Sequence, residues 1–118
     1  MPENISSDDV CYFCKSPITE PEFAAEFLTT GGSVYKFDDM ACLIASARVT
    51  GKENIKSIYV MDADSKTWAP AEKMQFVRSD KLRTPKNGGL VAFKDASKAR
   101  DLASRYQADL VKLDDLVK

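Results

Sequence analysis

The sequence predicts an α+β fold made of two related ββαβ halves in one compact domain. Two observations support this fold class. The glycine pairs Gly31-Gly32 and Gly88-Gly89 each separate two extended runs, which is typical of a hairpin turn. After each second run comes an aspartate and then apolar residues at helical spacing. A chain of 118 residues fits one domain, so the two halves are expected to share it.

The first half contains strand-like runs on both sides of its glycine pair, at Glu22–Thr30 and Ser33–Asp39. Asp38 is expected to cap the helix that follows. The apolar stripe of that helix repeats at i, i+3, i+4 and i+7, and consists of Met40, Leu43, Ile44 and Ala47. Gly51 is expected to end the helix, and a third strand is predicted over Ile55–Asp62.

The second half repeats this order, with strands predicted over Lys73–Ser79 and Leu90–Ala96. Asp95 is expected to cap its helix. The apolar stripe of the helix consists of Ala99, Leu102, Ala103 and Tyr106. A last strand is predicted over Asp109–Asp115. The halves therefore span about 10–64 and 65–118, and the segment Ala63–Glu72 joins them. The alternative is an ordinary α+β domain with two coincidental hairpins.

The charges of the chain nearly cancel, with 17 basic and 18 acidic residues. This balance argues against nucleic acid as a partner, which requires a basic face. No apolar run approaches the roughly 20 residues of a membrane span. There is no signal-peptide pattern, which indicates either a cytosolic protein or a chain that starts after a removed leader. Residues 1–9 are polar and are predicted to be a flexible segment before a single domain over 10–118.

The three cysteines are the residues with the clearest chemistry, because the chain contains no histidine. Cys11 and Cys14 form a C-x-x-C motif, and Cys42 follows in the first predicted helix. An odd cysteine count excludes a disulfide framework as the basis of the fold. Thiolate sulfur favours Cu(I), zinc and iron–sulfur clusters over magnesium or calcium.

Four interpretations of the C-x-x-C motif remain open at this point. A structural zinc site needs four ligands and would require Asp38, Asp39 or a second chain. A thioredoxin-like couple is disfavoured because Pro17 and Pro21 follow the motif and no helix starts there. An inert Cys11–Cys14 bridge is the third interpretation. A soft-metal site, above all for Cu(I), is the interpretation that we favour.

Two further sulfurs are candidates for such a site. Met61 ends a predicted strand beside polar Asp62, where a side chain could face a site at the end of the sheet. Cys42 lies near a helix N-terminus, which favours the thiolate. Met40 and Met74 are predicted to be core residues.

The aspartate pairs Asp38-Asp39 and Asp114-Asp115 are interpreted as caps and solvated surface. Without histidine there is no Ser/His/Asp set, and Gly88-Gly89 lacks the rest of a phosphate-binding loop, so no enzyme activity is predicted.

Several stretches together resemble the NosL family of copper-binding nitrous oxide reductase accessory proteins. They are CYFCKSPI, YKFDDMACLI, SIYVMDADSKTWAPAEKMQFV and TPKNGGLVAF, and the resemblance covers roughly Val10 to Leu116. It implies two ββαβ halves similar to those of the organomercurial lyase fold. It also implies a lipid-anchored protein outside the cytoplasmic membrane that delivers Cu(I) to the reductase apparatus.

The chain departs from the family pattern at two methionine positions. The family motif C-x-x-C-G-M continues here with Lys15-Ser16, and the motif T-P-M-G reads Thr84-Pro85-Lys86-Asn87. Some members have histidine where this chain has Met61.

The resulting hypothesis is a non-catalytic, extracytoplasmic Cu(I) metallochaperone that uses Cys11, Cys14 and Met61, with Cys42 as a further candidate. It would serve an acceptor metalloprotein, and its membrane contact would be through a lipid anchor. The alternatives are an interaction module with structural or disulfide-bonded cysteines, and an organomercurial-lyase-like enzyme with Asp38 or Asp39 as proton donor.

Overall fold

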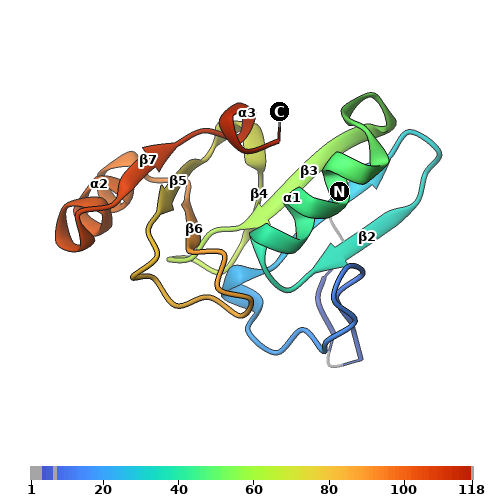
Figure 1. The fold of residues 1–118 in the computed structure, drawn as a ribbon, viewed down its shortest axis with the longest axis horizontal. Coiled ribbons are helices and arrows are strands. Elements are labelled where there is room, and N and C mark those ends of the chain that lie inside the picture. The colour runs from blue at the N-terminus through green and yellow to red at the C-terminus, as the bar shows by residue number, and fades with distance from the viewer. Residues whose placement is uncertain (1–3, 7, 118) are drawn as a thin grey trace.

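Two antiparallel sheets form the framework of the molecule, which a computed structural model describes for residues 4–6 and 8–117 (Figure 1). The first sheet has the strand order β2-β1-β3-β4, and the second has the order β6-β5-β7. The first-sheet strands are β1 (Ala25–Thr29), β2 (Val34–Phe37), β3 (Ile55–Met61) and β4 (Trp68–Pro70). The second-sheet strands are β5 (Gln75–Arg78), β6 (Leu90–Phe93) and β7 (Asp109–Val111). The helices are α1 (Met40–Thr50), α2 (Ala96–Tyr106) and α3 (Leu113–Leu116).

The predicted duplication is confirmed by the strand pairing. In the first half, β1 is the central strand and pairs antiparallel with β2 and β3. In the second half, β5 pairs in the same way with β6 and β7. Each half places its long helix between its second and third strands. The two halves therefore have one topology, and the α+β fold of two ββαβ units is correct.

The helix caps agree with the sequence in one half and differ by one residue in the other. Asp95 caps α2 and accepts a hydrogen bond from the backbone of Ser97 at 2.8 Å. In α1 the cap is Asp39, which accepts from the backbone of Ala41 at 3.0 Å, so the prediction of Asp38 as the cap was wrong. Asp38 lies one position earlier, in the turn between β2 and α1, and its side chain is free for another role.

Two elements were missed by the sequence patterns. The segment that joins the halves contributes the short strand β4, which extends the first sheet beside the last three residues of β3. The predicted strand Asp109–Asp115 ends at Val111, and α3 follows. Both are too short for periodicity to identify.

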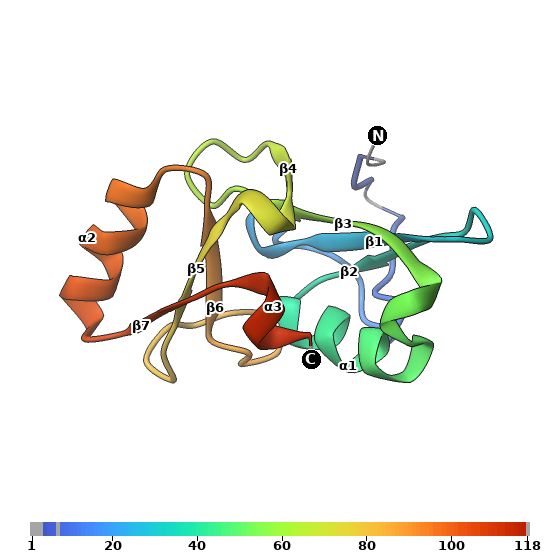
Figure 2. The ribbon, with the colours of Figure 1, turned by 90° about the horizontal axis from the view of Figure 1, so that it is seen from above.

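The main core lies between the two halves. Phe27, Phe37 and Leu43 of the first half are fully buried in one cluster with Met74 and Phe76 of the second. Figure 2 shows the second sheet between α2 and the first half. Because side chains alternate along a strand, the neighbour of Phe76 in β5 points the other way. That neighbour, Val77, is buried in a second cluster with Ala99 and Ala103 of α2.

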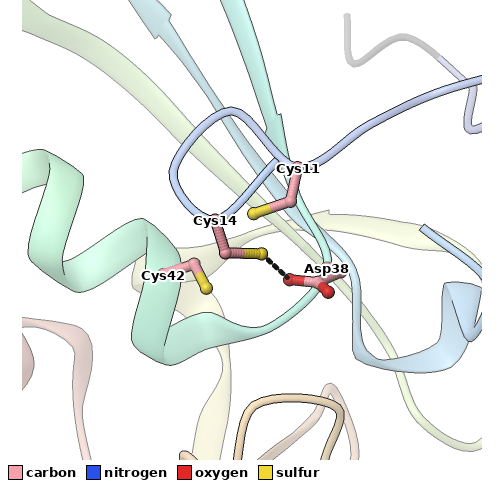
Figure 3. A group of neighbouring side chains, drawn as sticks. All are labelled: Cys11, Cys14, Asp38 and Cys42. Carbon is pink, nitrogen blue, oxygen red and sulfur yellow. Dashed lines mark hydrogen bonds between the residues drawn. The ribbon is translucent and has the colours of Figure 1, made fainter. Parts of the chain in front are cut away.

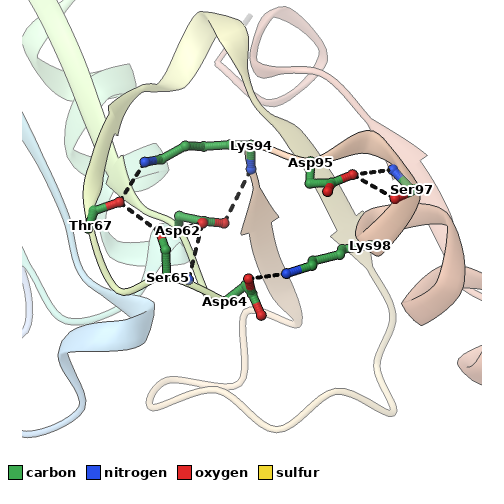
Figure 4. A network of polar contacts seen from close by, with 8 residues as sticks. All are labelled: Asp62, Asp64, Ser65, Thr67, Lys94, Asp95, Ser97 and Lys98. Carbon is green, nitrogen blue, oxygen red and sulfur yellow. Dashed lines mark hydrogen bonds and ion pairs between the residues drawn. The ribbon is translucent and has the colours of Figure 1, made fainter.

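A polar network also joins the halves beside this core (Figure 4). The buried carboxylate of Asp62, after β3, accepts hydrogen bonds from the backbone of Lys94 after β6 at 3.2 Å and from the Ser65 hydroxyl at 2.6 Å. Lys94 also donates from its ammonium group to Thr67, and Lys98 forms an ion pair with Asp64. These contacts fix the end of β3 against the second half.

The segment before Val10 contacts β2 through Asn4 and Asp9. The ammonium group of Lys36 lies 2.9 Å from the carbonyl oxygen of Asn4 and 3.0 Å from Oδ2 of Asp9. Residues 1–3 and 7 lie outside the described residues, and the flexibility of the segment 1–9 stays a prediction. Among the described residues, no helix combines the length and the apolarity needed to cross a bilayer.

Candidate metal centre

The C-x-x-C motif lies on a tight loop that folds back on itself. Val10 and Pro17 form an isolated antiparallel bridge at its base. Within the loop, the backbone N–H of Cys11 donates to the carbonyl of Ser16 at 2.8 Å, and that of Lys15 donates to Cys11 at 2.9 Å. Lys15 adopts a φ of 66°, which lets the chain reverse directly after Cys14. This reversal places both sulfurs on one side of the loop.

Tyr12 attaches the loop to the first sheet. Its backbone N–H donates to the carbonyl of Lys36 in β2 at 2.8 Å. The centroid of its ring lies 4.1 Å from that of Tyr35, and its ring packs edge-to-face with that of Phe37. The motif is therefore held over the end of β2, where the chain enters α1.

Four side chains converge at this point (Figure 3). The ligand atoms of Cys11, Cys14, Asp38 and Cys42 all lie within 4.8 Å of one another. The thiol of Cys14 donates to Oδ1 of Asp38 at 3.6 Å. The loop supplies two sulfurs, the turn between β2 and α1 supplies the carboxylate, and α1 supplies the third sulfur. All three cysteines are free thiols in the structure.

The site is closed on its inner side and accessible on one edge. Cys11 is 0% exposed and Cys42 is 4% exposed, whereas Cys14 is only half-buried. Cys14 is therefore the sulfur that a ligand from outside reaches first.

The surroundings change the acidity of the three thiols in different directions. Burial raises the pKa of the Cys14 thiol, but hydrogen bonds from the Ser16 backbone, from Cys11 and from the Ser16 hydroxyl outweigh this and lower it below its usual value. Burial raises the pKa of Cys11. Burial, with the neighbouring Cys11, Cys14 and Asp38, also raises the pKa of Cys42. The expectation that the helix N-terminus favours a Cys42 thiolate was therefore wrong for the metal-free protein.

The interpretation of Asp38 and Asp39 as solvated surface is also wrong. Asp38 is 3% exposed and Asp39 is 0% exposed. Apart from its predicted role as a helix cap, Asp38 is a candidate fourth zinc ligand or proton donor in the sequence, and the structure places it among the sulfurs. A sequence signal for this role is its position four residues before Cys42, just ahead of the helix.

Met61 has a different location from the three cysteines. It ends β3 as predicted and is buried, as are Met40 and Met74. Met61 lines a small cavity together with Met40, Val60 and Phe76, which belong to the main core cluster. The role of Met61 as a ligand stays a prediction.

The two positions at which the resemblance expects methionine lie side by side. The ammonium group of Lys86 donates to the Ser16 hydroxyl at 2.9 Å. Although 70 residues separate them in the sequence, both positions border one site. Both positions carry hard, polar groups where the resemblance implies soft sulfur.

The donor set determines which ions the site can hold. Three thiolates suit Cu(I), which accepts two or three soft ligands, and the added carboxylate also makes a four-ligand set of the kind that Zn(II) uses. Magnesium and calcium prefer oxygen ligands and are excluded by the predominance of sulfur.

Fold and site together define a small α+β protein with a sulfur-rich candidate metal centre. The family model named NosL matches residues 2–118, and the chain therefore belongs to the NosL family. The crystal structure of the copper chaperone NosL from Shewanella denitrificans is similar, with a TM-score of 0.90 and 19% sequence identity. The similarity covers 100% of this chain and 96% of that one, and at this identity it shows the fold alone. A search of curated proteins finds no match.

Proposed function

We propose that this protein binds Cu(I) through the thiolates of Cys11, Cys14 and Cys42 and delivers the ion to an acceptor metalloprotein. The observation that carries the proposal is the convergence of three sulfurs within 4.8 Å in a chain without histidine. Soft thiolates favour Cu(I). Family membership supports the same role, because the solved relative is a copper chaperone.

The unequal burial of the ligands suits transfer rather than permanent storage. Cys11 and Cys42 are enclosed by the core, and Cys14 is at the accessible edge. A thiolate or thioether of the acceptor would reach the metal from the side of Cys14 and replace that ligand first. The buried sulfurs would then release the ion in turn, so that the copper is never free in solution.

We further propose that the protein works outside the cytoplasmic membrane, held by a lipid anchor, and serves an acceptor such as nitrous oxide reductase or its assembly complex. This proposal rests on the family resemblance. Fractionation of the native host tests it, because a cytosolic, anchor-free protein would contradict the location. Loss of copper in the acceptor after deletion of the chaperone tests the delivery.

An anaerobic titration with Cu(I) against a competing chelator tests the metal assignment. We expect the reduced protein to bind one Cu(I) far more tightly than Zn(II) at neutral pH. Zinc binding of equal or greater strength in the same competition would refute the copper proposal and favour a structural zinc site.

One contact favours a second candidate function. The carboxylate of Asp38 lies beside the thiol of Cys14, which is the arrangement that cleavage of a carbon–mercury bond requires. In such a reaction the Cys14 thiol would pass its proton to Asp38 as the cysteine sulfurs take the mercury, the C–Hg bond would break, and the carbon would receive that proton from Asp38. Incubation with phenylmercury and detection of benzene tests this candidate, and the absence of benzene excludes it.

A further inference from the structure

Lys86 brings a positive charge from the second half to the loop that carries Cys11 and Cys14. It lies in the loop between β5 and β6, and its ammonium group donates to the Ser16 hydroxyl at 2.9 Å. Ser16 follows Cys14 by two residues, and its carbonyl accepts a hydrogen bond from Cys11 at 2.8 Å. The cation therefore contacts the same short loop that supplies two of the sulfurs.

The backbone of Lys86 is fixed by a buried group. Its N–H donates to Oδ2 of Asp39 at 2.7 Å, and the Thr84 hydroxyl donates to the same oxygen at 2.7 Å. Asp39 is fully buried and directly follows the candidate ligand Asp38. These hydrogen bonds anchor the backbone of the loop that carries Lys86 beside the candidate metal site.

A positive charge at this place distinguishes between metal ions of different charge. With its three thiolates and one carboxylate deprotonated, the site carries four negative charges. Bound Cu(I) leaves one more of these charges uncompensated than bound Zn(II) does. By Coulomb's law a nearby cation stabilises the more negative complex more strongly. The donor set alone admits both ions, so this difference affects selectivity.

We propose that Lys86 is a specificity-determining residue of the metal site, whose charge favours Cu(I) over Zn(II). The inference rests on the proposed function and adds to it the residue that biases the choice of metal. The contact with Ser16 is exposed to solvent, so the effect is moderate and decreases with ionic strength.

Three variants test this selectivity in the reduced full-length protein. Lys86→Gln removes the charge and keeps a hydrogen-bonding side chain, Lys86→Arg keeps the charge, and Lys81→Gln removes an exposed lysine from the same loop. At low salt we expect Lys86→Gln to lower the Cu(I)-to-Zn(II) affinity ratio by about three- to fivefold. The other two variants should leave the ratio near that of the wild type, and high salt should reduce the effect. An unchanged ratio in Lys86→Gln would overturn the inference while leaving the Cu(I) proposal intact.

A second measurement on the metal-free protein separates this inference from the proposed function. Anionic iodoacetate and neutral iodoacetamide alkylate the same Cys14 thiolate, so the ratio of their rates cancels the thiolate fraction and reports the local potential. We expect Lys86→Gln to lower this ratio by about two- to threefold, and Lys86→Arg to preserve it. If the wild type binds no Cu(I), the proposed function fails, and the alkylation ratio still decides whether the charge acts at Cys14. An unchanged alkylation ratio in Lys86→Gln would contradict that action.

Discussion

Cys42 and Met61 are the two candidates for the third sulfur ligand. The structure places Cys42 among the other ligand atoms, and Met61 at the end of β3. We expect Cys42→Ala to lower the Cu(I) affinity at least about tenfold, equivalent to about 1.4 kcal/mol, because a thiolate donor is lost. A ligand role for Met61 requires a loss of about the same size in Met61→Leu. Both affinities are measured by anaerobic chelator competition.

Two core methionines serve as controls for that experiment. Met40→Leu and Met74→Leu keep the volume and apolarity of buried side chains and should leave the Cu(I) affinity unchanged. If Met61→Leu behaves as these controls do, the sulfur ligands are the three cysteines. If Cys42→Ala binds Cu(I) as tightly as the wild type, Cys42 is not a ligand.

The raised pKa values of Cys11 and Cys42 predict a pH dependence of copper binding. Both thiols are protonated at neutral pH in the metal-free protein, so binding must release their protons. The Cu(I) affinity should therefore rise with pH, by about ten- to a hundredfold per unit for one or two released protons. Chelator competition at several pH values between 6 and 8.5 measures this slope. An affinity that does not change with pH would exclude ligation by these thiols.

At the scale of elements, the two helix caps predict unequal contributions to stability. Asp39 caps α1 and also accepts hydrogen bonds from Thr84 and Lys86 of the second half. Gly88 packs so closely here that a Cβ atom would lie 2.5 Å from Asp39 Oδ1. Asp39→Ala removes the cap and leaves buried donors without a partner, so we expect a loss of about 2–4 kcal/mol in the free energy of unfolding.

The cap of α2 is the matched control. Asp95 is exposed, and its carboxylate accepts hydrogen bonds from Ser97 at the start of its own helix, so Asp95→Ala should cost less than Asp39→Ala. Urea denaturation of both variants measures the difference. Equal losses would show that the bonds from Asp39 to the second half contribute little.

The hydrogen bonds of Asp62 at the end of β3 predict a pH-dependent contribution to the free energy of unfolding. Burial raises the pKa of Asp62, but hydrogen bonds from Ser65 and the Lys94 backbone outweigh it and lower the pKa below its ordinary value. Because the pKa is lower in the folded state, the ionised carboxylate stabilises the protein at pH values above the unfolded-state pKa of about 3.9. This stabilisation is lost as the pH falls through the folded-state pKa. We expect Asp62→Asn to cost about 1–3 kcal/mol at pH 7 and less at pH 3.

Asp64 supplies the comparison for that variant. Its ion pair with Lys98 is exposed, so Asp64→Asn should change the free energy of unfolding by at most about 1 kcal/mol at either pH. Denaturant titrations at pH 7 and pH 3 give both differences. A cost of Asp62→Asn that grows toward low pH would have the wrong sign for this explanation.

At the scale of the whole molecule, an oxidising compartment would expose the accessible edge of the site to disulfide formation. Cys11 and Cys14 lie close together on one loop, and a disulfide cannot ligate Cu(I). We expect air-oxidised protein to lose Cu(I) binding and reductant to restore it. Mass spectrometry confirms the redox state of each sample, and undiminished binding by fully disulfide-bonded protein would contradict the ligand assignment.

Local patterns in the sequence are enough to predict most of the fold. The glycine-pair hairpins and the helical stripes depend on residues a few positions apart, so they can be recognised without knowing the rest of the structure. The C-x-x-C motif was found for the same reason. The short elements β4 and α3 were missed because their conformation depends on packing against neighbouring elements rather than on a pattern of their own.

By itself, the sequence determined the two ββαβ halves, their turns and the cysteine-centred candidate site, because these follow from propensity, periodicity and short spacing. Only the tertiary structure decided that Asp38 is buried among the sulfurs and that Cys42 faces them from α1. It also decided that Lys86 contacts Ser16 across 70 residues of sequence. The physical reason is that burial and long-range contacts arise when the two halves pack together, and no local pattern encodes which polar side chains that packing encloses.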